Sequence, residues 1–172
     1  MKKFLKFSGA IAFVLALVAF ILMMATPAIM YKGDDVIAKG IVAIFGKKEN
    51  VAVAGISLGT AETKLAWSAL LAWIFILVAL VILCLGIVLP LLKVKTLEKF
   101  AGVMNLCAVV LLVLAGVFMF ITTPVFWAAN GGDSVPNNVA LGAGWVIGGI
   151  LAIVAGIVAI LPAVADFLGK KK

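Results

Sequence analysis

Few side chains in this sequence could carry out chemistry. Among its 172 residues there is no histidine, all fourteen basic residues are lysines, and two are cysteines. Without imidazole groups, a bis-histidine haem site and the usual histidine-based metal sites cannot form. The two cysteines are too far apart in the sequence for a Cys-x-x-Cys redox motif. We therefore expect no catalytic residue, no metal site and no cofactor, and a protein that is not an enzyme.

Three weakly polar residues within apolar stretches are the remaining candidates. Cys84 and Cys107 lie at similar distances from the short loop between them, which places them at one expected depth. They could form a redox pair, but we favour two small, buried packing residues. Asn105 is the most polar residue well inside an apolar stretch. It could hold a ligand, but we expect it to be buried and to hydrogen-bond to another helix or to a backbone carbonyl.

The stretch from Ala66 to Leu92 has no charged residue between Lys64 and Lys93. A helix needs about 20 apolar residues to cross a bilayer. The chain has three similar stretches. It is 66% hydrophobic, and its mean hydropathy is +1.35. These features predict an all-α membrane protein. We expect a four-helix transmembrane bundle with a small ordered extracellular cap. Residues 1–172 would form a single membrane domain, with spans at about 7–26, 66–89, 100–121 and 140–161, outer loops at 27–65 and 122–139, and an inner loop at 90–99.

The first apolar stretch, from Phe7 to Ala25, could instead be the core of a secretory signal peptide, because three lysines precede it. It is longer than an ordinary signal core, and Ala25-Thr26-Pro27-Ala28 is a poor cleavage site. We therefore interpret it as the first span.

Charge predicts how the spans are oriented. The two chain ends and the 90–99 loop carry nine lysines and two acids, whereas the two outer loops carry five of each. Cytoplasmic loops are enriched in lysine, so we expect a multi-pass protein of the cell membrane with both termini in the cytoplasm. Nucleic acid is then not needed to explain the net charge of +7. Aromatic residues expected to anchor the outer membrane interface agree with this orientation: Trp67, Trp73, Trp127, Trp145 and Tyr31.

Small residues recur every four positions in the fourth span, at Gly144, Gly148, Ala152 and Gly156. Such stripes let helix backbones approach closely in a membrane. We expect this one to pack within the chain, although a second copy or another membrane protein could also contact it.

A weak internal repeat is also present. Trp73 lies seventeen residues before Pro90, and Trp145 lies seventeen residues before Pro162. A leucine directly precedes each of these prolines. Duplication of a helical hairpin would explain this spacing, and so would the thickness of the bilayer.

The first outer loop is ambiguous between helix and strand. Apolar residues recur every four positions from Val36 to Phe45, which favours a helix capped by Asp35 and ended by Gly46, whereas the β-branched content suits a strand. We favour the helix, followed by a turn at 46–50 and a strand over Val51–Leu58. Gly59-Thr60-Ala61-Glu62 resembles a capping box before the second span.

The order of spans and loops resembles that of claudin-like and other tetraspan proteins along the whole chain. The claudin signature of Trp, Gly-Leu-Trp and two cysteines is missing, since the first outer loop has no cysteine and no tryptophan before Trp67. The Met1-Lys2-Lys3 start, the Ile44-Phe45-Gly46 segment and the chain length are more similar to four-span bacterial membrane proteins of Gram-positive bacteria and mollicutes. This resemblance implies topology but no activity.

These patterns together predict a non-enzymatic membrane protein. It would be an accessory, scaffold or interaction subunit that acts through its first outer loop or through the small-residue stripe. A small transporter or an oligomeric pore is the alternative, but no span shows the polar stripe that a pore would need.

Overall fold

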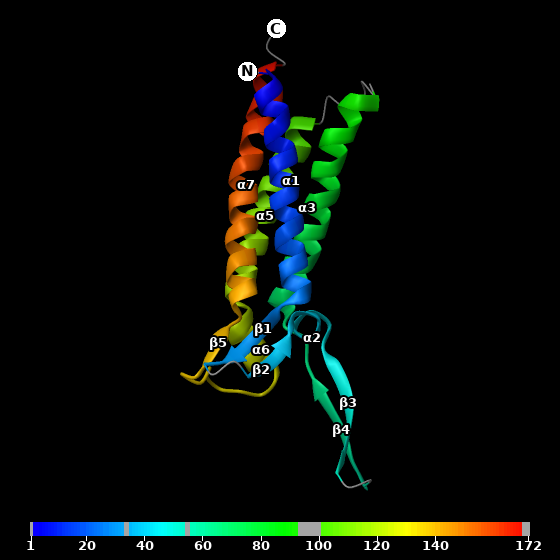
Figure 1. The fold of residues 1–172 in the computed structure, drawn as a ribbon, viewed down its shortest axis with the longest axis vertical. Helices are drawn as coiled ribbons and strands as arrows, with labels where there is room; N and C mark the ends of the chain where they lie inside the picture. Colours follow the sequence, from blue (N-terminus) through cyan, green and yellow to red (C-terminus); the bar gives the residue numbers. More distant parts are fainter. Residues whose placement is uncertain (1, 33–34, 54–55, 93–100, 170–172) are drawn as a thin grey trace.

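The chain folds into four long helices that carry a small cap at one end (Figure 1). The computed structural model describes residues 2–32, 35–53, 56–92 and 101–169. The long helices are α1 (Lys2–Ala25), α3 (Trp67–Leu92), α5 (Ala101–Phe120) and α7 (Ala143–Gly169). Each contains a segment long and apolar enough to cross a membrane. The predicted helical fold with four spanning helices is confirmed.

The four helices form a ring of neighbours. The most extensive contacts join α5 to α7, followed by those of α1 with α7 and of α3 with α5, while α1 and α3 share a smaller contact. Helices that follow one another in the sequence are therefore adjacent, and α7 closes the ring against α1. The start of α1 and the end of α7 lie at the end of the bundle away from the cap (Figure 1).

The interior of the bundle is built mainly from alanine. Helix α1 turns Ala12, Ala16 and Ala19 inward, and the other long helices bury alanines in the same way. Larger side chains such as Ile150 and Ile157 of α7 are half exposed on the outside. Water would penalise so much exposed apolar surface, whereas lipid does not, and small interior residues let the backbones approach closely. This distribution is that of an integral membrane protein.

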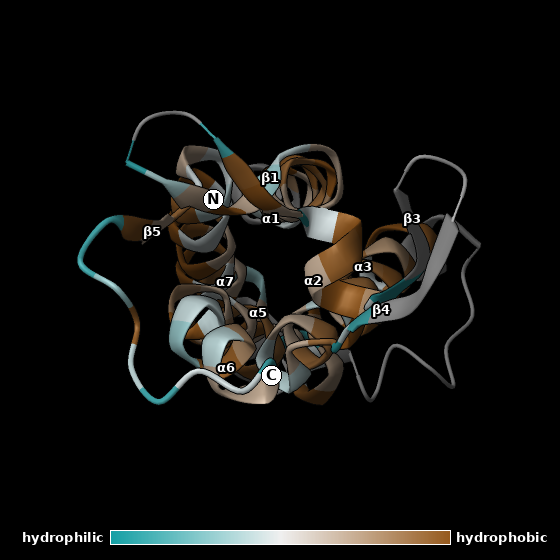
Figure 2. Ribbon diagram, turned by 90° about the horizontal axis from the view of Figure 1, so that it is seen from below, coloured by the Kyte–Doolittle hydropathy of each residue, from teal (hydrophilic) through white to brown (hydrophobic). Residues whose placement is uncertain are grey.

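The cap joins the two loops that leave the bundle at this end. Its sheet has three antiparallel strands in the order β2 (Val36–Lys39), β1 (Pro27–Tyr31) and β5 (Val139–Leu141). The central strand comes from the first loop and pairs with a strand of the second. Hydrophilic residues gather in these loops, whereas the long helices are largely hydrophobic (Figure 2).

Two short helices and a hairpin complete the cap. Helix α2 (Gly40–Phe45) follows β2, and α6 (Thr122–Ala129) begins the second loop. The hairpin of β3 (Lys47–Val53) and β4 (Ile56–Thr63) forms a separate two-stranded sheet. It projects away from the bundle (Figure 1).

The sequence at the end of α1 explains why a sheet begins there. Thr26 Oγ1 donates a hydrogen bond of 2.6 Å to the carbonyl of Leu22 in the last turn. Pro27 has no N–H and cannot continue the helical ladder, so the chain leaves as β1. The second loop is fastened to this strand by a hydrogen bond of 2.9 Å from Gly142 N to Ala28 O.

The helix expected over Val36–Phe45 is only partly present. Val36–Lys39 pairs with β1 instead, so the helix is restricted to Gly40–Phe45. Asp35 does not cap it, because Lys39 is the N-cap residue and makes no side-chain hydrogen bond there. The β-branched residues of this segment favour the strand once β1 offers an edge to pair with. Gly46 ends the helix with a φ of 73°, a conformation that glycine adopts without strain.

The rest of the first loop also differs from expectation. The turn at 46–50, the single strand Val51–Leu58 and the capping box Gly59–Glu62 are replaced by the paired strands β3 and β4. Helix α3 begins after them, at Trp67. Pairing between the two strands gives hydrogen-bond partners to the backbone N–H and C=O groups. In a turn or a helix cap, local side chains would have to supply these partners.

The second loop is more ordered than expected. Helix α6 follows α5 directly, and Val139–Leu141 forms β5 before α7 begins at Ala143. Helix α7 also continues through Pro162, where we expected it to end. A proline inside a membrane helix is tolerated when neighbouring groups satisfy the freed backbone carbonyl.

Candidate functional site

The two cysteines do not pack inside the bundle. Cys84 and Cys107 are both exposed on its outer surface, with free thiols. The prediction that they are buried packing residues is therefore wrong. Leu83 of α3 and Ala108 of α5 take the inward positions, and the adjacent cysteines are turned away from the interior.

We expect the double substitution Cys84→Ser and Cys107→Ser to leave the fold and the cellular activity intact, because neither thiol fills an interior space. Membrane level and thermal stability in detergent would be compared with those of the original protein. Loss of activity at an unchanged membrane level would show that a thiol has a role that its surface position does not reveal.

Asn105 is buried, with 7% of its surface exposed, and its side chain approaches α3. A Cβ built on Gly86 would lie 3.1 Å from Asn105 Oδ1, so this glycine makes room for the amide. The placement suits a residue that joins α3 to α5.

The small-residue stripe of α7 faces other helices of the same chain. Gly148 lies beside Met119 of α5 and the backbone of Ala19 in α1, and Gly156 lies beside Val113. Gly144 lies against Thr26, and Ala152 is fully buried. The stripe is therefore occupied within the chain and is not free to contact a second copy or another protein.

Helices α5 and α7 approach closely at a pair of glycines, Gly116 and Gly149, that the sequence pattern did not indicate. A Cβ on Gly116 would lie 2.7 Å from the carbonyl oxygen of Gly149, closer than real side chains come. Gly149 directly follows Gly148, so the four-residue spacing of the predicted stripe includes Gly148 and leaves Gly149 out. A Cβ on Gly149 would lie 3.4 Å from the carbonyl oxygen of Gly116, an ordinary contact, so the approach depends mainly on glycine at position 116, which a pattern within α7 does not show.

The five predicted interface aromatics all lie toward the cap end of the bundle, but their environments differ. Trp67 and Tyr31 are substantially exposed, as interface anchors should be. Trp73 packs edge-on against Phe45 of α2, with ring centroids 5.3 Å apart. Trp145 is fully buried, so it does not anchor the protein to lipid headgroups. Trp127 belongs to the cap.

A layer of polar side chains lies where the cap meets the bundle. Ser68 Oγ donates to Thr122 Oγ1 at 3.3 Å, and Thr122 Oγ1 donates to the carbonyl of Phe118 at 2.9 Å. Three further buried groups have no hydrogen-bond acceptor within the described part of the protein: Trp73 Nε1, Thr123 Oγ1 and Trp145 Nε1. This layer lies at the boundary between the apolar bundle and the cap.

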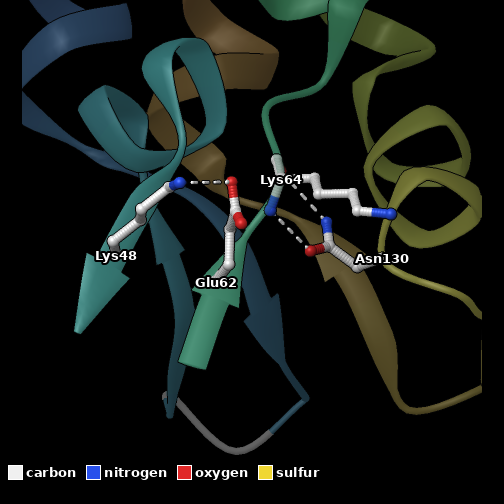
Figure 3. A network of polar contacts seen from close by, with 4 residues as sticks. All are labelled: Lys48, Glu62, Lys64 and Asn130. Carbon is white, nitrogen blue, oxygen red and sulfur yellow. Dashed lines mark hydrogen bonds and ion pairs between the residues drawn. The ribbon is translucent and has the colours of Figure 1, made fainter. Parts of the chain in front are cut away.

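Asn130 fastens the two loops of the cap together (Figure 3). Lys64 N donates to Asn130 Oδ1 at 2.8 Å, and Asn130 Nδ2 donates to Lys64 O at 3.1 Å and to Phe126 O at 2.9 Å. The amide thus pairs with both backbone groups of Lys64, as a neighbouring strand would. We call these three hydrogen bonds the Asn130 latch. The sequence shows an Asn-Gly-Gly turn here but not its partner 66 positions away.

A pocket of about 440 Å³ lies beside the latch. Its walls come from both loops: Ile37, Thr63, Phe126, Trp127, Asn130, Gly131 and Gly132. Gly132 lies against the indole of Trp127, where a Cβ would overlap the ring. We call this the seam pocket. It is an open depression whose lining combines apolar side chains with a hydroxyl and an amide.

The exposed ion pair at the base of the hairpin contributes little by comparison. Lys48 Nζ lies 3.4 Å from Glu62 Oε1, and the side chains are 73% and 55% exposed (Figure 3). Pairs of this kind typically stabilise a protein by about 0–1 kcal/mol and are screened by salt. This pair joins the two strands of the hairpin to each other, whereas the latch joins the end of the hairpin to the second loop.

The described residues do not bring together the groups that metal chemistry needs. Within 2–32, 35–53, 56–92 and 101–169, no three His, Cys, Asp or Glu side chains form a possible metal site. No protein-family model matches the chain, and no curated protein matches its sequence.

Proposed function

We propose that this protein is a non-enzymatic subunit of the cell membrane, with an accessory, scaffold or interaction role, and that it binds its partner through the cap. The seam pocket is the observation that supports this most. Residues from β2, β4 and α6 line it, so two loops far apart in the sequence build one recognition surface. A subunit that only filled space in the membrane would not need this construction.

The walls of the seam pocket favour a partner that inserts an apolar side chain. Ile37, Phe126 and the indole of Trp127 supply apolar surface, and Thr63 supplies a hydroxyl. Interfaces commonly gain most of their affinity from a few such buried anchors, with aromatic residues over-represented among them. Lys64 is exposed next to the latch and would suit an acidic group on the rim of the partner.

The proposed orientation places the cap outside the cell and both termini in the cytoplasm. Its support is the lysine distribution in the sequence: the chain ends and the 90–99 segment carry nine lysines and two acids, while residues 27–65 and 122–139 carry five of each. Trp67 and Tyr31, which are exposed where the cap meets the bundle, agree with an interface at that level.

The bundle itself does not favour transport. Its buried polar side chains in the described residues are Ser8 and Asn105 toward one end and Ser68, Thr122 and Thr123 toward the other. Between them the interior consists of residues such as Ala79, Leu112 and Ala155. A solute path needs polar groups along its whole length, which this interior does not supply.

A photoreactive side chain at position 37 tests the proposal. Position 36 is the matched control, because Val36 is exposed and does not line the pocket. We expect a discrete cross-linked product in native membranes from position 37 and none from position 36. The product should disappear when Trp127→Ala is added. Identical products from both positions, or none from position 37 in cells that need the protein, would contradict the proposal.

A further inference from the structure

Asn130 is followed by Gly131 in the turn that closes α6, and this pair has a specific reactivity. A backbone nitrogen can attack the side-chain carbonyl carbon of a preceding asparagine and close a five-membered imide. A side chain on the following residue hinders this attack, and glycine has none. The other two asparagines of this loop, Asn137 and Asn138, are followed by an asparagine and a valine and are more hindered.

The folded cap keeps Asn130 out of the reactive geometry. Its backbone ψ is 16°, which holds the nitrogen of Gly131 away from its own side chain, whereas imide closure needs that nitrogen turned toward Cγ. The latch also fixes the amide group through three hydrogen bonds to Lys64 and Phe126. Both constraints must be released before the ring can close.

We propose that Asn130 is a conditional modification site, protected while the latch is closed and deamidated when it opens. In the reaction, the Gly131 nitrogen loses its proton and bonds to Asn130 Cγ. The Cγ–Nδ2 bond breaks, and the amide leaves as ammonia. Water then adds to one carbonyl of the imide and opens the ring, which leaves aspartate or isoaspartate at position 130. Water is the only co-reactant, and no redox change occurs.

The product cannot close the latch again. A carboxylate has no N–H to donate, so the carbonyl oxygens of Lys64 and Phe126 lose their donor and face a negative charge instead. Once Asn130 is deamidated, the two loops would therefore stay apart at this point. Asn130 also lines the seam pocket, so the same change alters the proposed binding surface. The reactivity itself does not depend on whether the pocket has a partner.

Mass spectrometry of peptides from aged protein tests the proposal. The full chain in lipid nanodiscs would be compared with the same chain in denaturant, at one pH and temperature. We expect Asn130 to deamidate on the order of a hundredfold more slowly in the folded protein, because three hydrogen bonds of ordinary strength must open first. Asn138 serves as the control and should react slowly in both. Equal rates at Asn130 in the two states, or no faster reaction than at Asn138 in denaturant, would overturn the proposal.

Two variants test the link to the latch. Lys64→Pro removes the N–H that donates to Asn130 Oδ1 and should accelerate deamidation of the folded protein about tenfold, the effect of losing one or two hydrogen bonds. Asn130→Asp reproduces one product. Its carboxylate keeps an acceptor for the Lys64 N–H but is repelled by the carbonyl oxygens of Lys64 and Phe126, so the loops should separate and hydrogen exchange of the Lys64 N–H should speed up, with the four helices still protected. Unchanged deamidation in the first variant, or unchanged exchange in the second, would show that the latch does not control the site.

Discussion

Replacing Trp145 by alanine should lower the free energy of unfolding by about 3–5 kcal/mol, which is the usual cost of removing a large aromatic side chain from a core. The indole is fully buried near the start of α7, below the cap. Its removal would leave a cavity that neither the alanines of the bundle nor the short strands of the cap can fill. Thermal unfolding in nanodiscs, followed by circular dichroism, would measure the loss.

Two further variants separate the packing of Trp145 from a general effect of losing a tryptophan. Trp67→Ala removes an indole that is 50% exposed and should cost much less. Trp145→Phe keeps most of the ring and removes a buried N–H that has no acceptor in the described protein, so it should cost less than alanine. Equal losses at positions 67 and 145 would contradict the placement of Trp145 in the interior.

Replacing Gly116 by alanine should destabilise the protein by about 1–3 kcal/mol, the typical cost of overpacking. The new Cβ would lie 2.7 Å from the backbone oxygen of Gly149 and 2.6 Å from Cγ1 of Ile153. A backbone atom cannot move aside without shifting its helix, so α5 and α7 would have to separate. Their contact is the most extensive in the bundle, and the shift would reduce it along much of its length.

Gly9→Ala is the matched control for this substitution, because apart from the neighbouring backbone of its own helix no described atom lies within 4 Å of the Cβ it would add. Alanine has the higher helix propensity, so this change should be neutral or slightly stabilising. Thermal midpoints of the two variants would be compared in the same detergent. Equal midpoints would mean that α5 and α7 do not approach as closely as the structure shows.

The four spans could be predicted from the sequence because their signal is local. A stretch such as Ala66 to Leu92 has too much apolar surface for water, whatever the rest of the chain does. The inward faces could also have been found. Buried alanines at positions 12, 16 and 19 recur at helical spacing, and the same analysis of α3 and α5 would have placed the cysteines on the outside.

The cap could not be predicted in the same way because its structure depends on distant partners. Val36–Lys39 becomes a strand because β1 is present to pair with it, and β1 in turn pairs with residues more than a hundred positions later. Asn130 looks like an ordinary turn residue until Lys64 is placed beside it. The seam pocket, which lies between these elements, has no signature in either loop alone.

Cysteine labelling of intact cells tests most directly the central claim, a four-helix membrane bundle whose cap lies outside. Single cysteines would replace Lys3, Lys48 and Ser134 in a background that lacks Cys84 and Cys107, and an impermeant maleimide would be applied before and after permeabilisation. We expect immediate labelling at positions 48 and 134, which belong to the two cap loops, and labelling at position 3 only after permeabilisation. Labelling at position 3 in intact cells, with positions 48 and 134 protected, would contradict it.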